Sequence, residues 1–583
     1  MMKSWLVPLC VVACLAPAAP AAAGTSMAEP QTPPTVTPDE IHFRHDVLRP
    51  GTARQAGLLP DRVAQIRPVA ESYLAPTPDH PNHPSYPGAV VLAAHNGIVV
   101  QRFAIGDAVR YASPTVELPP EQRIPARVDT LYDLASVSKL FTTVVLLQLV
   151  EAGRVDLDAP VATYVPEFAA GGKAAITPRN LLNHNSGLPA FLPFYSSYPT
   201  PETRLAAALA TPVVAGTRPG AQYVYSDIGL IALGVLIQRV TGTTLDVAVR
   251  ERVTGPLSMT DTLYNPGPEL KSRIAATEYE PYVNRGMVWG EVHDENAWSL
   301  GGVAGHAGLF STADDLAIFC QMLLNGGYYR GHRILSEAMV RQALVNYNAG
   351  IELQYPESDR GLGFELNKQW YMDAMASPVS FGHTGFTGTS LVMDPLSHSF
   401  LIILSNRVHP DRNWGTNTAA RRAIARPFAD AHPVRPLFGG TAWRTERRDN
   451  STVTLTAPLR RPAAGHALAS FLLWYDTEPR SDSVIVETSA DGITWAPLPL
   501  TLRSVGHRFT TDGSLTGYGG RRWWQVTAAL PAGTTALRWS YRTDVSAQGR
   551  GVYVDHLLSV DPRGPLFAAG DTWTPDGWTE SAS

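Results

Sequence analysis

The stretch DTLYDLASVSKLFTT, residues 129–143, places a serine and a lysine three residues apart at the start of a helical pattern. Apolar residues recur at helical spacing over positions 137–145, and Gly153 marks the predicted end of the helix. Residues i and i+3 share one face of a helix, so the hydroxyl of Ser136 and the amine of Lys139 are predicted to meet.

This pairing suits nucleophilic catalysis. A serine hydroxyl attacks poorly until a neighbour accepts its proton, and a desolvated lysine can do so. The chain has five lysines against forty-two arginines, yet position 139 holds a lysine, and arginine cannot deprotonate in a protein. The helix start also offers backbone N–H groups and partial positive charge to an oxyanion. By itself, however, the pattern also fits a capping serine beside a solvated lysine.

A second motif, Tyr225-Ser226-Asp227, precedes a helix predicted from Asp227 to Val240 and ended by Gly242. A tyrosine beside a lysine and a serine can relay protons when the amine lowers its pKa. The alternative for Tyr225 is an ordinary buried aromatic residue.

A third motif, FGHTGFTG at residues 381–388, introduces two predicted strands, Ser390 to Asp394 and Phe400 to Ser405. Glycine at Gly385 would let a substrate backbone lie close to the strand. The backbone N–H of Phe386 would complete an oxyanion hole. A plain glycine turn is the alternative.

With these motifs in order, the chain resembles the serine β-lactamase and penicillin-binding-protein superfamily, particularly class C enzymes, D-alanyl carboxypeptidases and related esterases. The resemblance covers roughly residues 41–431. It rests on DTLYDLASVSKLFTT, ITPRNLLNHNSGLP, YVYSDIGLIALG and FGHTGFTGTSLVMDP, while VHDENAWSLGGVAGHAGLFSTADDLAIF resembles a subgroup that includes penicillin-binding protein 4B. The implied fold is α+β, with an antiparallel sheet, flanking helices and a helical lobe.

The resemblance also implies the roles of the site residues. Ser136 would attack the acyl carbon, Lys139 and Tyr225 would handle its proton, and the N–H groups of Ser136 and Phe386 would hold the oxyanion. The residues expected to contact substrate are Asp227, His383, Thr384, Gly385 and, at the rim, His306. No cofactor is expected.

Two positions depart from the family's pattern. Asp227 replaces the usual asparagine, and an ionised carboxylate cannot donate a hydrogen bond to a substrate amide, although it can pair with Lys139. His383 replaces the usual lysine, which exchanges a permanent cation for a group expected to titrate near neutrality. Both changes count against an efficient β-lactamase and are compatible with a peptidase or an esterase.

A metal site is the alternative for several other polar residues: His184, His293, Asp294 and His306. Their spacing matches no zinc signature. The favoured interpretation is a glycine-rich loop whose polar side chains hold its own backbone.

The chain divides into five predicted segments. Lys3, an apolar stretch and small residues before Gly24 predict an export signal over residues 1–23, and Cys14 leaves a lipoprotein signal as the alternative. A Pro- and Thr-rich linker at 24–40 precedes the hydrolase domain at 41–431. A second linker at 432–440 leads to a β-sandwich resembling a jelly roll at 441–583.

The sandwich segment alternates short apolar strands and holds eight of the thirteen tryptophans. Most of these are predicted to form its core, and exposed ones would stack on sugars of a wall glycan. Asp555 is a candidate calcium contact.

A formal net charge of -5 without a basic stripe argues against nucleic-acid binding. Three functions remain open at this stage: an exported peptidoglycan-directed acyl hydrolase acting on a cell-wall peptide, a carboxylesterase on the same scaffold, and a non-catalytic wall-binding protein. The predicted location is periplasmic or secreted.

Overall fold

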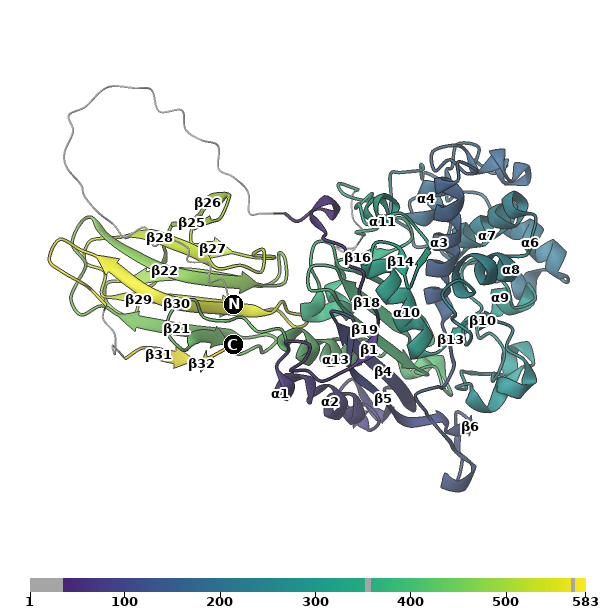
Figure 1. Ribbon diagram of the computed structural model, residues 1–583, viewed down its shortest axis with the longest axis horizontal. Coiled ribbons are helices and arrows are strands. Elements are labelled where there is room, and N and C mark those ends of the chain that lie inside the picture. Colours follow the sequence, from purple (N-terminus) through teal and green to yellow (C-terminus); the bar gives the residue numbers. More distant parts are fainter. Residues whose placement is uncertain (1–34, 352–357, 568–571) are drawn as a thin grey trace.

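A computed structural model describes residues 35–351, 358–567 and 572–583. The predicted export signal at 1–23, including Cys14, lies outside the described residues. Figure 1 shows two bodies side by side, a large α+β body and a smaller all-β body that follows it in the chain. The predicted fold class is confirmed.

The large body is built on a mostly antiparallel sheet. Its strands, in spatial order, are β1 (Arg49–Pro50), β5 (Ile98–Val109), β4 (Gly88–His95), β19 (Ser399–Ser405), β18 (Ser390–Asp394), β17 (Phe381–Thr384) and β16 (Glu365–Leu366), with β8 (Ile124–Pro125) beside β5. The hairpin between β4 and β5 turns at Asn96 and Gly97, whose φ values of 51° and 72° are those of a tight hairpin turn. The hairpin and the late strand pair predicted from the sequence are both confirmed.

Both faces of this sheet are buried, because successive side chains of a strand point to opposite faces. On β4, Val90 and Leu92 join the core beneath the central helices, whereas Val91 and Ala93 join a second core beneath the outer helices. Figure 1 shows the central helices on one side of the sheet and the outer ones on the other. The helices that cover the two faces are α3 (Ser138–Glu151) and α10 (Ala313–Leu324) on one side, and α1 (Pro60–Val63), α2 (Ile66–Ser72) and α13 (Thr418–Asp430) on the other.

The helices begin and end as their capping residues dictate. Thr312 caps α10 by accepting a hydrogen bond from the Asp315 N–H, as its sequence pattern predicts. Gly242 ends α7 (Asp227–Thr241) in the left-handed conformation, φ 77°. The helical lobe beyond α3 contains α4 (Pro178–Leu182), α6 (Pro201–Ala210), α7, α8 (Leu245–Val249) and α9 (Glu295–Ser299).

The C-terminal body consists of two packed antiparallel sheets. The first holds β26 (His507–Thr511), β25 (Leu500–Ser504), β28 (Trp524–Leu530), β22 (Ala467–Asp476), β30 (Gly551–Val560), β20 (Ala442–Thr445) and β32 (Trp578–Ser581). The second holds β24 (Ala496–Pro497), β23 (Ser483–Ser489), β29 (Ala536–Arg542), β21 (Thr452–Pro458) and β31 (Thr574–Asp576), with β27 (Ser514–Leu515) beside β23.

Tryptophans fill the space between these sheets, which confirms the core prediction for most of them. Four are almost fully buried, Trp474, Trp524, Trp539 and Trp578. Asp555, considered above as a calcium contact, instead accepts hydrogen bonds from the N–H groups of Leu437 and Phe438 and so anchors the connecting segment.

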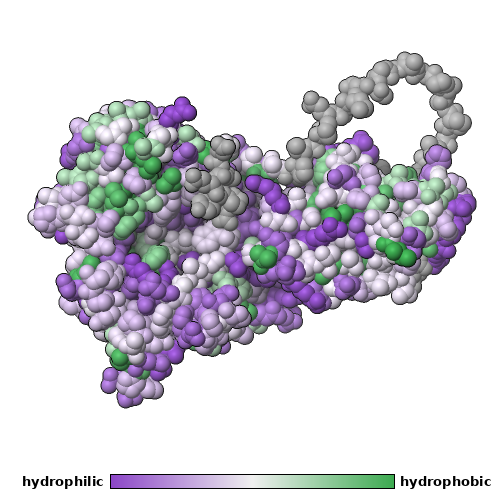
Figure 2. Space-filling view, turned by 180° about the vertical axis from the view of Figure 1, so that it is seen from behind, coloured by the Kyte–Doolittle hydropathy of each residue, from purple (hydrophilic) through white to green (hydrophobic). Residues whose placement is uncertain are grey.

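The two bodies meet through ion pairs. Asp430 at the end of α13 pairs with Arg444 and Arg447 of the sandwich. Asp394 of β18 pairs with Arg521, and Arg426 of α13 reaches toward Asp449 at 3.5 Å. Seen from behind in Figure 2, the outer surface is largely hydrophilic, with apolar patches gathered on the helical lobe.

Among the described residues, no single helix has the length and hydropathy to cross a membrane, and one strongly bent pair, Asp227–Thr241 with Leu245–Thr254, meets these two criteria only when taken together.

Candidate active site

A cleft of about 630 Å³ runs between the sheet edge and the helical lobe. Ser136 lies on its wall, in a short 3-10 turn (Ala135–Val137) that leads into α3. The cleft also brings in Tyr225 from the start of α7 and residues 383–386 from the end of β17. The three sequence motifs therefore converge on one cavity.

Lys139 lies directly beneath Ser136 and is almost fully buried. Its Nζ donates hydrogen bonds to Ser136 Oγ at 2.8 Å and to the backbone oxygen of His306 at 3.1 Å. The third oxygen around Nζ is Oδ1 of Asp227, at 2.8 Å. An ammonium has three protons to donate, so these three oxygens match its full capacity.

The carboxylate decides the charge of this lysine. Burial lowers the pKa of Lys139, but Asp227 and Tyr225 outweigh burial and hold that pKa above its ordinary value. Lys139 is therefore an ammonium at neutral pH, paired with the residue that replaces the family's asparagine.

Tyr225 completes the cluster around Ser136. Its ring lies 4.9 Å from Lys139 Nζ. Burial raises the pKa of Tyr225, against the opposing effect of Lys139 and of hydrogen bonds with Lys139 and Ser136. The tyrosine is therefore protonated at rest and able to donate a proton.

His184 holds this second motif in place. Its buried ring lies 4.5 Å from the Tyr225 ring, and its Nδ1 accepts a hydrogen bond from the Ser226 N–H at 3.0 Å. Burial, reinforced by Arg360 and Lys139, lowers the pKa of His184 well below its ordinary value, so the ring stays neutral and keeps this acceptor. The prediction that polar loop side chains bind their own backbone is met here.

His383 marks the other end of the cleft, and its charge differs from the sequence expectation. Its Nδ1 lies 2.7 Å from the Thr384 backbone oxygen and its Nε2 lies 3.4 Å from Arg360 Nη1. Burial lowers the pKa of His383 to about 4, with Arg360 and Lys139 acting in the same direction. The expectation that it titrates near neutrality is wrong, because an arginine occupies the space where a proton would sit.

Arg360 supplies the cation that His383 does not. It is buried, pairs with Glu365 at 2.9 Å, and donates hydrogen bonds to the Tyr223 hydroxyl at 3.0 and 3.2 Å. Burial lowers the pKa of Arg360, but Tyr223 and Glu365 outweigh burial, and the guanidinium remains charged.

Sequence reasoning did not find Arg360, and it also missed the other basic side chains of the cleft. The cationic residues of the cleft lining are Arg360, Lys368, Arg407 and Arg421, against the single carboxylate of Glu365. Burial lowers the pKa of Arg407 and of Arg421 to about 10, so both remain charged at neutral pH. They come from separate elements without any local motif, so only the fold reveals them.

The turn after β17 packs against the segment that carries Ser136. A side chain on Gly385 would collide with the Leu134 backbone oxygen, 2.4 Å from its Cβ position. The glycine is thus required by the protein's own backbone, rather than by a substrate lying against the strand. Thr384 lies on the cleft wall beside it.

Phe386 follows this glycine and is half exposed in the cleft. Its carbonyl accepts a hydrogen bond from Arg407 Nε at 2.8 Å. Among residues 35–351, 358–567 and 572–583, none accepts a hydrogen bond from the Phe386 N–H. This N–H can therefore serve a ligand oxygen, as an oxyanion hole requires.

His306 does not lie at the rim, where it was expected. Its side chain is 1% exposed and its Nε2 lies 2.8 Å from Asp294 Oδ1. Asp294 in turn caps α9 by accepting from the Ala297 N–H. His306 serves the site through its backbone oxygen, which binds Lys139.

Comparison with known proteins agrees with this arrangement. A sequence model described as "Beta-lactamase" matches residues 73–426, more than half of the chain. The chain belongs to the beta-lactamase family. Within this family it is a serine hydrolase by type, and the finer placement beside penicillin-binding protein 4B stays a prediction.

Two relatives carry the name "Putative D-alanyl-D-alanine carboxypeptidase". The one from Escherichia coli K12 is 34% identical over 361 residues, which cover 56% of this chain and 79% of that protein. The one from Escherichia coli O157:H7 is 32% identical over 403 residues, covering 63% and 87%. A solved beta-lactamase-family structure, "EstCE1, a hydrolase with promiscuous acyltransferase activity", is 21% identical with a TM-score of 0.48 and covers 64% of this chain and 99% of its own.

Proposed function

We propose that this beta-lactamase-family protein is a peptidase that removes the C-terminal residue of a peptide ending in a free carboxylate, as a D-alanyl-D-alanine carboxypeptidase does. The observation that carries this proposal is the charge of the cleft, which sets four cations against one carboxylate. A neutral ester gains nothing from such a lining, whereas a terminal carboxylate forms charge-assisted hydrogen bonds with it. The names of the relatives point to the same substrate class.

The nucleophile in this proposal is Ser136, and its proton is passed on through Lys139. The amine already carries three protons, so it must release one to Asp227 as it accepts the serine proton. The distances of 2.8 Å on either side of Nζ allow this relay without movement of the side chain. The result is a bond from Ser136 Oγ to the acyl carbon, with the proton held on Asp227.

The remaining steps return this proton. The oxyanion is held by the N–H groups of Ser136 and Phe386. As the tetrahedral intermediate collapses, Tyr225 gives a proton to the departing amine and is reprotonated through Lys139 from Asp227. A water molecule then attacks the acyl-enzyme by the same relay, which releases the shortened peptide and restores the serine.

Esterase activity is the second candidate, because Asp227 cannot donate a hydrogen bond to a substrate amide as an asparagine would. An ester needs no such donor. Export to the periplasm or beyond, and contact of the sandwich with wall glycan, remain parts of the proposal that rest on the sequence alone.

The test is intact-mass analysis and steady-state kinetics of the full chain with two substrates, a pentapeptide ending in D-Ala-D-Ala and p-nitrophenyl acetate. We expect release of D-alanine with a far higher kcat/KM for the peptide than for the ester, and loss of both activities in Ser136→Ala. Efficient ester hydrolysis without D-alanine release would replace the peptidase by the esterase, and activity that persists in Ser136→Ala would remove the nucleophile.

A further inference from the structure

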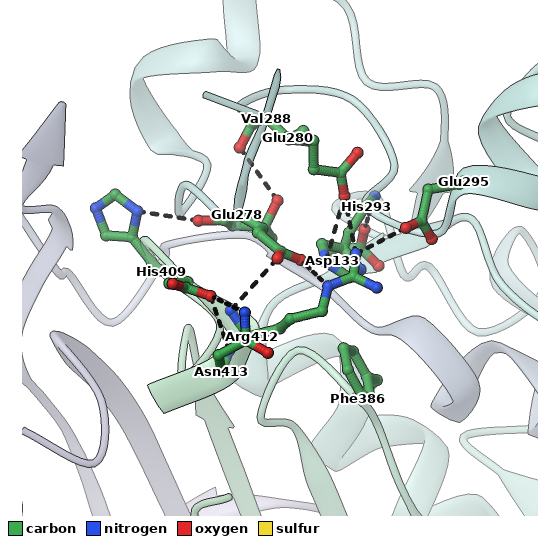
Figure 3. A network of polar contacts seen from close by, with 12 residues as sticks. Asp133, Glu278, Glu280, Val288, His293, Glu295, Phe386, His409, Arg412 and Asn413 are labelled. Atoms are coloured by element: carbon green, nitrogen blue, oxygen red, sulfur yellow. Dashed lines mark hydrogen bonds and ion pairs between the residues drawn. The ribbon is translucent and has the colours of Figure 1, made fainter. Parts of the chain in front are cut away.

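Beside the cleft lies a buried cluster of charged residues that the proposed chemistry does not use. Figure 3 shows Glu278, Glu280 and Glu295 gathered around His293 and Arg412, with Phe386 next to them. His293 and the three glutamates are nearly buried, with side-chain exposures of 6% or less. A cluster so costly to desolvate calls for a specific role.

Cationic groups already occupy the places where a metal ion would bind. Arg412 lies 2.5 Å from Glu278 and 2.8 Å from Glu295. Glu280 pairs with Arg285 at 3.0 Å, and His293 Nε2 lies 2.8 Å from Glu278. Burial lowers the pKa of His293, but Glu278 and Glu280 outweigh burial and raise it above the ordinary value. Three glutamates thus face two guanidinium groups and one imidazolium, so the cluster is balanced.

The Phe386 ring rests on this cluster. It stacks on the His293 ring, with centroids 5.7 Å apart and planes 29° apart. The Arg412 guanidinium lies 5.6 Å from the ring centroid on the same residue, and that of Arg407 lies at 4.3 Å. Phe386 is 48% exposed, so these contacts, and not burial in a core, fix the direction of its backbone N–H.

The same cluster reaches the backbone next to Ser136. One oxygen of buried Asp133 accepts from the His293 N–H at 2.6 Å, and the other accepts from the Ala135 N–H at 2.8 Å. Ala135 has a φ of 45°, a left-handed conformation that is unfavourable for alanine and persists only where its surroundings impose it. The hydroxyl of Thr387 binds the Asp133 backbone oxygen at 2.7 Å, which ties the Phe386 turn to the same segment.

We propose that Arg412, with His293 and Glu278, is a positioning residue for the oxyanion hole. The cluster sets the N–H of Phe386 and the N–H of Ser136 at a fixed separation, through the Phe386 ring on one side and Asp133 on the other. This inference rests on the proposed serine chemistry and adds residues that never touch the substrate. Misplacing one donor slows the step in which negative charge develops and leaves substrate binding intact.

The test measures acylation of Ser136 by p-nitrophenyl acetate in rapid-mixing experiments that separate the dissociation constant from the acylation rate. Arg412→Gln should acylate about 10- to 100-fold more slowly, with the dissociation constant within about twofold. The matched control is Arg426→Gln. Arg426 pairs with buried Asp373 at 2.9 Å and is 25% exposed, against 28% for Arg412, but it lies away from the cleft. Its rate should stay within about twofold of wild type.

A double-mutant cycle removes the ambiguity of a damaged fold. Phe386→Ala deletes a half-exposed ring and keeps the backbone N–H, so it should fold and acylate slowly. If Arg412 acts through that ring, the double variant should be no slower than the slower single variant. Equal rates for Arg412→Gln and Arg426→Gln, a wild-type rate for Phe386→Ala, or multiplicative losses in the double variant would each overturn the proposal. No acylation of Ser136 in the wild type would instead refute the proposed function.

Discussion

The cleft has two buried ion pairs, and they differ in the one property that matters for catalysis. At the reacting end Lys139 faces Asp227 at 2.8 Å, and at the binding end Arg360 faces Glu365 at 2.9 Å. A lysine can give up its proton inside a protein, whereas an arginine cannot. The first pair can therefore move protons, and the second can only hold charge. The difference teaches that similar distances and burial do not imply similar roles.

The sharpest way to break this comparison is Lys139→Arg, which gives the reacting end the chemistry of the binding end. We expect a loss of about 10²- to 10⁴-fold in acylation rate although the positive charge remains. Stopped-flow kinetics with p-nitrophenyl acetate would measure it. Lys173→Arg is the matched control, since Lys173 is equally buried and binds only backbone oxygens, at 2.6 and 2.7 Å. An arginine variant close to wild type would mean that only charge matters at position 139.

The reverse test weakens the binding end. Arg360→Gln should raise KM for a peptide ending in D-Ala-D-Ala by roughly 10- to 100-fold, because a charge-assisted hydrogen bond contributes about 1.5–3 kcal/mol. The kcat for this peptide should change little. Hydrolysis of p-nitrophenyl acetate, which has no carboxylate, serves as the control and should stay within about twofold. Parallel losses on both substrates would assign Arg360 a structural role instead.

Asp227→Asn separates charge from proton transfer at the reacting end. Without the carboxylate, burial alone acts on Lys139 and lowers its pKa, and the neutral amine must then accept the serine proton itself. An amine still loses its proton at higher pH than a carboxyl group does, so the acidic limb of the pH–rate profile should move to higher pH. We expect a rate about tenfold lower at pH 7. An unchanged limb would show that Asp227 takes no part in the relay.

The smallest expected effect concerns His383. With a pKa of about 4, this histidine is neutral across the physiological range, so it contributes no charge to carboxylate binding. KM for the D-Ala-D-Ala peptide should therefore vary by less than about twofold between pH 5 and pH 8. A rise in KM centred near pH 6.5 would restore the titrating histidine that the sequence suggested.

Local patterns were enough to predict much of the fold. Capping residues and helical spacing located α3, α7 and α10, and Asn96-Gly97 located the hairpin of the central sheet. These features depend on neighbours within a few residues, so the chain order reveals them. Ser136, Lys139 and Tyr225 were found for the same reason, because each lies in a short motif at the start of a helix.

The rest of the site depends on contacts between distant segments. Arg360, Arg421 and Arg412 reach the cleft or its border from three separate parts of the chain, and arginines are common throughout the sequence. The pKa of His383 could not be foreseen, since it depends on Arg360, a residue twenty-three positions away, packed against its ring. His306 was misplaced at the rim because a histidine in a glycine-rich segment gives no sign of its burial.

Helix α13 links the cleft to the sandwich within a few turns. Near its start, Arg421 donates hydrogen bonds to the backbone oxygens of Gly385 and Thr389, at 3.0 and 2.8 Å. At its end, Asp430 takes both of its partner cations, Arg444 and Arg447, from the sandwich. A hydrolase domain cut away at this helix would keep its catalytic residues but strand a carboxylate that the intact chain neutralises. The two bodies are therefore best regarded as a single unit of folding, and the sandwich as part of what the enzyme needs to mature.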